Sequence, residues 1–244
     1  MAVVVRANHP RAEAVTLAAP TVRAYTFDAA MTLFEVYPSV GAVYAEVAAR
    51  FDAHADAAAL DAAFHRAWRE RKPTDAHTSE SDEWQWWHRT VRRTFELAGA
   101  LNTLDGQFDA FFEVVYARFD EASAWRLYED AIPTLTRLKD DGYPLAIVSN
   151  FDSRLHTVIA NLGLAPFFDR VVISAAAGVR KPDRAIFLQA CRELGVDPSE
   201  TCHIGDSIEE DYEGALAAGL QARLLKRGGD TGDGIVTSLD ALPL

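Results

Sequence analysis

The chain has 244 residues, of which 49% are hydrophobic and 25% are charged, proportions that are ordinary for a globular protein and exclude a disordered or fibrous chain. This length predicts one or two domains with a sizeable buried core. A formal net charge of −12 makes nucleic acid and anionic membrane surfaces poor partners, although a small anionic substrate can still bind where a site is locally positive or holds a metal.

The cysteine content and the chain start are informative about the compartment. Cys191 and Cys202 are too few for a disulfide framework and lack the spaced partners of a zinc site. We expect two buried thiols in a reducing compartment. No apolar run reaches the length of about 18 residues that a membrane span needs, and the apolar start of the chain is too short for a signal peptide. We therefore predict a cytoplasmic protein.

The first half of the chain predicts an extension, one strand and a helical insert. Residues 1–20 show no sustained period and form an N-terminal extension of uncertain order. Residues 22–27 predict a strand that ends at Asp28. From about residue 38, apolar side chains recur at helical spacing, first at Val40, Val43, Tyr44 and Val47 and then in residues 59–68, 84–98 and 108–119. These patterns predict an all-helical cap domain over residues 37–123.

The remaining chain alternates between helices and strands. A helix over residues 131–139 is followed by a glycine at 142, and another opens at Lys181-Pro182-Asp183 with proline near its first position. Short apolar strands are predicted at 145–148, 171–174, 201–204 and 222–226, with further helices ending near 162 and 219. This alternation predicts an α/β fold, a Rossmann-like parallel sheet with helices on both faces, formed by residues 21–36 and 124–244.

Polar side chains follow the predicted strand ends. Because the carboxyl ends of parallel strands share one edge of a sheet, where ligands bind, we expect these residues to form one site. They are Asp28 with Thr32, Ser149 with Asn150, Lys181, and Asp206 with Asp211.

Each of these residues has a chemical and a purely structural interpretation. Asp28 can act as a nucleophile or metal ligand, or it can bond the amides of the following loop. Asp28 and Asp206 together would suit Mg²⁺. Lys181 can neutralise a carboxylate and a substrate anion, or lie on the surface before a helix. Ser149 and Asn150 can bind phosphate oxygens or form a turn.

The segment after Asp206 also fits a helix start. Ser207 and Glu210 match the capping-box pattern S-x-x-E, in which the two side chains bond each other's backbone amides. This capping leaves Asp206 free for a metal.

These motifs, in this order, resemble the haloacid dehalogenase-like hydrolase superfamily over roughly residues 22–226. Residues 28–33, Ser149-Asn150, Lys181-Pro182 and residues 205–211 are similar to its four motifs, and the helical insert, with residues around Tyr44 and 84–87, resembles a subgroup with a helical cap. The resemblance implies that Asp28 is the nucleophile, that Thr32 and Ser149 position the substrate, and that Lys181 balances charge. It also implies Mg²⁺ bound by Asp28, Asp206 and the backbone carbonyl of Ala30, with Asp211 in support.

The sequence departs from the phosphatases of that family at one position. They carry a second aspartate two residues after the nucleophile, which protonates the leaving group and then activates water; this chain has Ala30 there, followed by Met31 where glycine is usual. General acid–base catalysis contributes roughly 10²–10⁴-fold. A residue of the cap can substitute, or the substrate needs no acid.

Four hypotheses follow. The first is a Mg²⁺-dependent phosphohydrolase of small phosphorylated metabolites, acting through an Asp28 aspartyl-phosphate. The second is a catalytically weakened binding or regulatory protein. The third is phosphonate hydrolysis, as in relatives with alanine at this position and a Schiff-base lysine in the cap, where this insert offers Lys72. The fourth is 2-haloacid hydrolysis, against which Gly205-Asp206-Ser207 argues.

The cap helix at 84–98 leaves two interpretations open. Its three tryptophans and the following arginines can close over a substrate and grip an anion, or they can form a packed core with a solvated face. The residues are Trp84, Trp86, Trp87, Arg89, Arg92 and Arg93.

Overall fold

A parallel sheet of six strands forms the core of the protein, whose computed structural model describes residues 21–70 and 79–242. The strand order is β5-β4-β1-β6-β7-β8, and every pair is parallel. The central strands are buried along their whole length, as expected for apolar runs covered on both faces. The strands are β1 (Ala24–Phe27), β4 (Leu145–Ser149), β5 (Arg170–Ile173), β6 (Thr201–Gly205), β7 (Gln221–Leu225) and β8 (Ile235–Val236).

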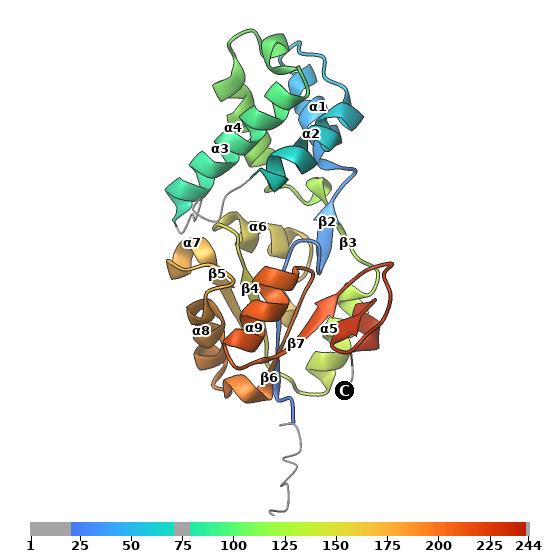
Figure 1. The fold of residues 1–244 in the computed structure, drawn as a ribbon, viewed down its shortest axis with the longest axis vertical. Helices are drawn as coiled ribbons and strands as arrows, with labels where there is room; N and C mark the ends of the chain where they lie inside the picture. The colour runs from blue at the N-terminus through green and yellow to red at the C-terminus, as the bar shows by residue number, and fades with distance from the viewer. Residues whose placement is uncertain (1–20, 71–78, 243–244) are drawn as a thin grey trace, which may run out of the picture.

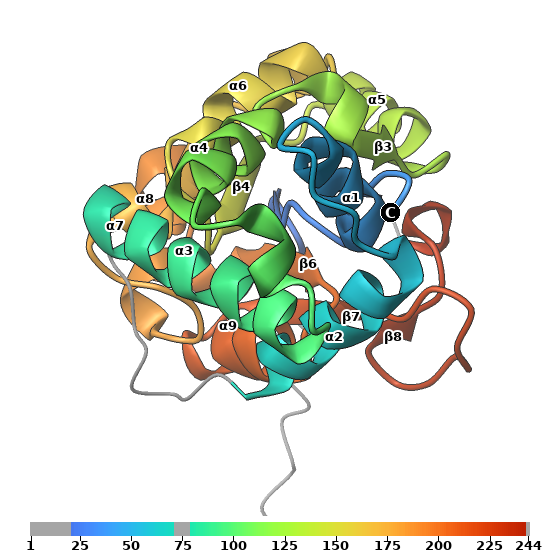
Figure 2. The ribbon, with the colours of Figure 1, turned by 90° about the horizontal axis from the view of Figure 1, so that it is seen from above.

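Helices cover both faces of this sheet (Figure 2). On one face α5 (Ala131–Asp140) and α6 (Arg154–Asn161) bury apolar side chains against β1, β4 and β6. On the other, α8 (Arg184–Leu194) and α9 (Gly214–Ala217) pack against β4, β5 and β7. The predicted Rossmann-like α/β core is thus confirmed.

A separate helical cap lies over the carboxyl ends of the strands (Figure 1). It consists of α1 (Val40–Ala49), α2 (Ala57–Arg69), α3 (Glu80–Leu97) and α4 (Phe108–Arg118), and it has its own apolar cluster. Side chains of Ser39, Asp56 and Ser79 cap the first three helices. A Cβ at Gly41 would meet the Ala57 carbonyl oxygen at 2.1 Å, so glycine permits the close packing of α1 on α2.

The chain crosses between core and cap on a two-stranded antiparallel sheet. In it β2 (Phe34–Val36) pairs with β3 (Trp125–Leu127), next to the predicted domain boundaries. The rings of Phe34 and Trp125 meet edge to face at 5.1 Å. Neither strand was expected from the sequence, because three residues are too few to show a period of two.

The structure corrects two local predictions. Helix α8 begins at Arg184 with Asp183 as its cap, so Pro182 precedes the cap instead of opening the helix. The helix expected after Ser207 begins as a π-helix, η5 (Ile208–Glu213), before α9. Short elements without a sequence signal complete the fold: α7 (Ser174–Ala177) and the 3₁₀ turns η1 (Leu101–Leu104), η2 (Ala122–Ala124), η3 (Ala165–Phe167), η4 (Pro198–Glu200) and η6 (Leu239–Ala241).

The structure also bears on the predictions for the two cysteines and for membrane-spanning segments. Cys191 and Cys202 are buried free thiols, and burial raises the pKa of Cys202 to about 11. Among the described helices, none combines the length and apolar character that crossing a bilayer requires. Residues 1–20 and Lys72 lie outside the described residues.

Candidate active site

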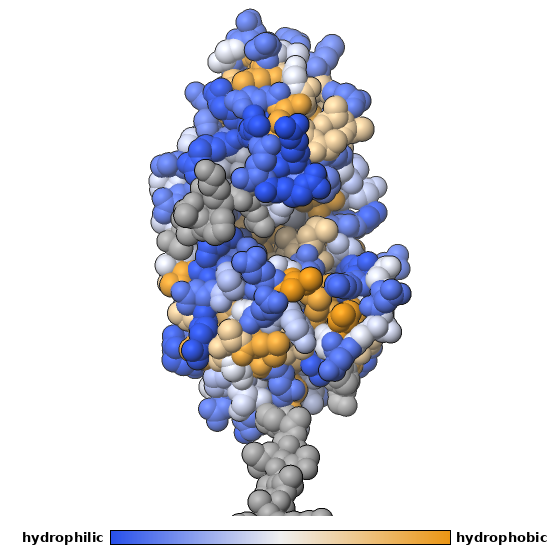
Figure 3. Space-filling view, in the orientation of Figure 1, coloured by the Kyte–Doolittle hydropathy of each residue, from blue (hydrophilic) through white to orange (hydrophobic). Residues whose placement is uncertain are grey.

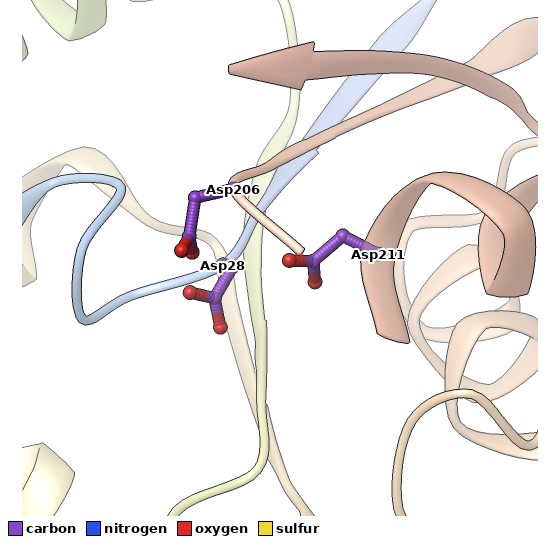
Figure 4. Close-up of side chains that lie close together, drawn as sticks. All are labelled: Asp28, Asp206 and Asp211. Atoms are coloured by element: carbon purple, nitrogen blue, oxygen red, sulfur yellow. The ribbon is translucent and has the colours of Figure 1, made fainter. Parts of the chain in front are cut away.

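The polar residues predicted at the strand ends meet beneath the cap. Asp28 follows β1, Ser149 ends β4, Asp206 follows β6, and Lys181 lies in the loop before α8. Figure 4 shows the carboxylates of Asp28, Asp206 and Asp211 turned toward one another, with ligand atoms within 4.8 Å. The topology brings them together because β4, β1 and β6 are adjacent strands.

Lys181 is the central cation of this cluster. Its Nζ donates to Asp28 Oδ1 and to Asp211 Oδ1, both at 2.6 Å, and the residue is 2% exposed. Burial favours the neutral amine, but the charges of Asp211 and Asp28 outweigh it and hold the pKa of Lys181 above its usual value. Lys181 is therefore a buried, charged group and not a surface lysine.

Asp211 is fully engaged in holding Lys181. Besides Lys181, its Oδ1 accepts from His203 Nε2 at 3.1 Å, and its Oδ2 accepts from the Ser207 amide at 2.9 Å. Burial opposes ionisation, yet Lys181 and His203 together hold the pKa of Asp211 below its usual range. Asp211 thus positions the cluster and leaves metal binding to others.

His203 and Gly205 support this arrangement from β6. Burial lowers the pKa of His203, so its ring is neutral, donating through Nε2 to Asp211 and accepting from the Thr26 hydroxyl at Nδ1. A Cβ at Gly205 would lie 2.2 Å from the Asp211 carboxyl carbon, so glycine makes room for that carboxylate.

The predicted capping box is wrong in one half. The Ser207 hydroxyl accepts from the Glu210 amide at 3.1 Å, as expected. The Ser207 amide, however, bonds Asp211, and the Glu210 carboxylate pairs with Arg180 at 3.4 Å. The π-helical turn explains the difference, because it sets the Asp211 carboxylate against the start of the helix.

Asp28 is held in place before any substrate binds. Its Oδ1 accepts from Ser149 at 3.2 Å as well as from Lys181, and the Thr32 hydroxyl lies 3.5 Å from both Asp28 Oδ2 and Asp206 Oδ1. Burial and the charge of Asp211 outweigh Lys181 and raise the pKa of Asp28 to about 6. Loss of hydration and the charges of Asp28 and Asp211 raise the pKa of Asp206 to about 7.

The donor set fits Mg²⁺. Hard oxygen donors are the ligands this ion prefers, and it binds through one or two carboxylates. With Asp211 committed to Lys181, Asp28 and Asp206 are the carboxylates that would hold it. Burial, followed by the charges of neighbouring carboxylates, raises the pKa of each, and a divalent cation beside them favours their ionised forms. The Ala30 carbonyl stays a predicted third ligand.

Asn150 acts on Lys181 in this structure. Its Nδ2 donates to the Lys181 carbonyl at 3.0 Å, and its Oδ1 accepts from the Lys181 amide at 2.8 Å. Both groups of the side chain amide are therefore occupied by the backbone that carries the lysine. Sequence reasoning expected Asn150 to meet phosphate oxygens, whereas here it positions the loop before α8.

We expect Asn150→Ala to lower the free energy of unfolding by about 1–3 kcal/mol, because it leaves two backbone groups of Lys181 unpaired. Urea unfolding measures this change. Asn161→Ala is the matched control, since Asn161 makes one exposed bond to the Asp120 carbonyl, and it should change stability far less. Equal effects of the two variants would contradict a positioning role.

A cavity of about 670 Å³ lies between the cluster and the cap. Asp28, Ala30 and Asp206 lie at its core end, and Trp86 and Trp87 of α3 belong to its cap wall. The arginines that follow these tryptophans, for which the sequence left two interpretations open, do not line it: Arg92 lies over the Phe108 ring and Arg93 pairs with Glu70.

Sequence reasoning missed the residues that join cap and core at this cavity. The Tyr116 hydroxyl of α4 donates to Asp152 Oδ2 at 2.6 Å, and Arg154 binds the same carboxylate and the Tyr116 carbonyl. Nearby, the Ser153 amide and hydroxyl bond the Glu80 carboxylate of α3. Contacts between residues so far apart in the chain leave no local pattern in the sequence.

Comparison with known proteins identifies the family. A model of the haloacid dehalogenase-like hydrolases matches residues 22–219. The chain belongs to this hydrolase family. It is 37% identical over 207 residues to "Haloacid dehalogenase-like hydrolase domain-containing protein 3" of Bos taurus, covering 83% of this chain and 81% of the relative. The predicted likeness to a capped subgroup of haloacid dehalogenase-like hydrolases is thereby confirmed.

Two further relatives of this haloacid dehalogenase-like hydrolase have phosphatase names. The glyceraldehyde 3-phosphate phosphatase of Methanopyrus kandleri is 40% identical over 102 residues, covering 41% of this chain and 44% of that one. The crystal structure of a HAD phosphatase from Thermococcus onnurineus is 25% identical, with a TM-score of 0.61 over 90% of this chain and 95% of its own.

Proposed function

We propose that the protein is a Mg²⁺-dependent phosphohydrolase of small phosphorylated substrates that acts through an aspartyl-phosphate on Asp28. The observation that carries this proposal is the carboxylate of Asp28, 8% exposed at the cavity floor and fixed by Lys181 and Ser149 beside Asp206. The two phosphatase-named relatives support the same reaction class.

Asp28, Lys181 and Ser149 have different roles in the proposed reaction. The Asp28 carboxylate attacks the phosphorus; the ester P–O bond breaks and its electron pair leaves on the departing oxygen. Water then attacks the phosphorus, which releases phosphate and restores the carboxylate. Lys181 remains protonated and offsets the charge of Asp28 throughout, while Ser149 fixes the carboxylate's orientation. Bound Mg²⁺ supplies charge neutralisation for the phosphoryl oxygens.

The first step proceeds here without the usual acid. Ala30 lines the cavity where relatives place an aspartate, and it has no proton to give. Asp211 is bound to Lys181 and Glu210 is paired with Arg180, so these neighbouring carboxylates are already engaged. With no proton donor at position 30, we expect the alcohol to leave as an anion, which favours substrates with acidic leaving groups.

Phosphate release from acetyl phosphate tests the proposal, because its acetate leaving group needs no proton. We expect turnover with Mg²⁺ and none after chelation. A protein that binds Mg²⁺ and phosphate but releases none from acetyl phosphate would be the weakened, ligand-binding member of the family. Dehalogenase structures with 24% identity or less share the fold alone and favour no other reaction.

The carboxylate pair makes stability depend on pH and metal together. Because the pKa of Asp28 and Asp206 is higher in the folded than in the unfolded chain, the folded state binds more protons between about pH 4 and 7. With chelator present, the free energy of unfolding should therefore fall as pH rises through this window. Mg²⁺ at ten times its dissociation constant should restore about 1.4 kcal/mol at pH 8 and less than half of that at pH 5, where protons compete.

Thermal unfolding at pH 5 and pH 8, with Mg²⁺ or chelator, measures this linkage without any substrate. Asp206→Asn should abolish most of the Mg²⁺ effect at pH 8. Equal stabilisation by Mg²⁺ at both pH values would place the cation away from Asp28 and Asp206.

A further inference from the structure

The cavity is much larger than the phosphoryl group that its floor is built to hold. Its volume of about 670 Å³ lies in the range of roughly 300–1,000 Å³ found for sites that enclose a whole organic ligand. The reacting group occupies only the core end, beside Asp28 and Asp206. The walls of the remaining space therefore indicate what the substrate carries beyond its phosphate.

Those walls are aromatic. In the cap, Trp68 of α2 packs edge to face on Trp86 of α3 at 5.4 Å and tilts over Trp87 at 6.0 Å. On the face seen in Figure 3 the outer surface is mostly hydrophilic, with scattered hydrophobic patches. Further rings that line the cavity are Tyr44, Phe64, Phe112, Tyr116, Phe119, Trp125 and Phe151.

Two charged groups of the cavity wall, Asp61 and Arg154, are engaged within the protein. The Asp61 carboxylate accepts from the Ser39 hydroxyl and the Gly41 amide, both at 2.6 Å. Arg154 holds Asp152 through several bonds and stacks on the Tyr116 ring at 3.4 Å. The upper cavity thus presents ring faces and edges, which favour a flat apolar group over a polyhydroxylated one.

We propose that the cavity takes aryl phosphates, with the phosphate at Asp28 and an aromatic ring system among the cap tryptophans Trp68 and Trp87. This inference rests on the proposed function and narrows it to one substrate class. Two independent features agree on that class. The aromatic wall binds such a ring, and the alanine at position 30 suits an aryloxide, which departs with the P–O electron pair without being protonated.

A pair of substrates separates ring recognition from leaving-group chemistry. Phenyl phosphate and 2-naphthyl phosphate release phenols of similar acidity but differ in aromatic surface. We expect KM for 2-naphthyl phosphate to be lower by at least about tenfold, as the burial of one further ring predicts. Trp87→Ala should reduce this preference to roughly threefold or less.

Trp84→Ala is the matched control. Trp84 lies on the same helix, is also half-buried and stacks on His88, but it does not line the cavity. It should keep the naphthyl preference. If Trp87→Ala fails to fold, Trp87→Leu retains apolar packing in the cap and should still weaken the preference. A preference unchanged in both Trp87 variants would overturn the assignment of the ring site.

Binding to Asp28→Asn keeps this test independent of turnover. Tryptophan fluorescence should report 2-naphthyl phosphate binding at least about tenfold tighter than inorganic phosphate. Equal affinities would overturn the aryl assignment even if acetyl phosphate is hydrolysed. Tight naphthyl phosphate binding without any hydrolysis by the wild type would instead refute the phosphohydrolase and leave the aryl site standing.

Discussion

Replacing Asp28 by asparagine is expected to reduce Mg²⁺-dependent phosphate release from acetyl phosphate by roughly 10³-fold or more, the scale seen when an enzyme loses its nucleophile. The amide cannot form the aspartyl-phosphate, although it can still accept from Ser149 and Lys181. The same change removes a buried carboxylate whose ionisation is opposed by loss of hydration and by the charge of Asp211, and whose own charge helps to raise the pKa of Asp206. The unfolding temperature without metal should therefore stay equal or rise while activity disappears.

Asp169→Asn is a suitable control for this experiment. Asp169 is also paired with a lysine, Lys139, but it bonds the Leu145 amide at the start of β4, at the opposite end of the sheet. It should retain full activity. An acid-quenched wild-type sample should also carry one phosphoryl group that is missing from Asp28→Asn. Activity of the Asp28→Asn variant above about a tenth of wild type would exclude covalent catalysis at this residue.

Restoring an acid at position 30 should change the dependence of rate on the leaving group. In the wild type, log kcat/KM is expected to fall steeply as the pKa of the leaving alcohol rises, because the oxygen departs unprotonated. Ala30→Asp places a carboxyl on the cavity wall and should raise hydrolysis of alkyl phosphates by about 10²–10⁴-fold. Acetyl phosphate should gain much less in the first step, since its leaving group needs no proton.

A series of aryl and alkyl phosphates measures both slopes. Ala30→Asn is the matched control, since the amide is similar in size but cannot transfer the proton, and its slope should remain steep. A flat slope in the wild type would show that another residue already donates the proton.

The backbone of the same loop is strained at Met31. Its φ is 67°, in the left-handed region that favours glycine, and Met31→Gly should relieve about 1 kcal/mol of backbone strain.

Much of the core, and the polar residues at the carboxyl ends of its strands, could be predicted from the sequence. Short apolar runs that each end in a polar residue define the strand ends, and the parallel topology then brings Asp28, Ser149 and Asp206 together. Lys181 was predictable only through its motif, because its burial depends on two carboxylates from other segments. Its residue pattern alone is that of a helix start.

Other features depended on contacts that no local pattern encodes. The π-helical turn after Ser207 places the Asp211 carboxylate where it accepts hydrogen bonds from Lys181 and His203. In this turn the Glu210 carboxylate pairs with Arg180. The contact of Tyr116 with Asp152 joins a cap helix to a core loop. The aromatic lining arises only when α2 and α3 fold against each other over the strand ends.

The antiparallel pair β2–β3 brings the two ends of the inserted segment side by side. In polymer terms the cap is a long loop whose two ends are held together by the core. Because the entropic cost of closing a loop grows only slowly with its length, adding or removing residues inside the cap changes the free energy of folding little. The sheet order and the positions of Asp28 and Lys181 do not depend on cap length. Selection can therefore rework the walls that choose a substrate while the reacting groups stay fixed, a division of labour built into the connectivity of the chain.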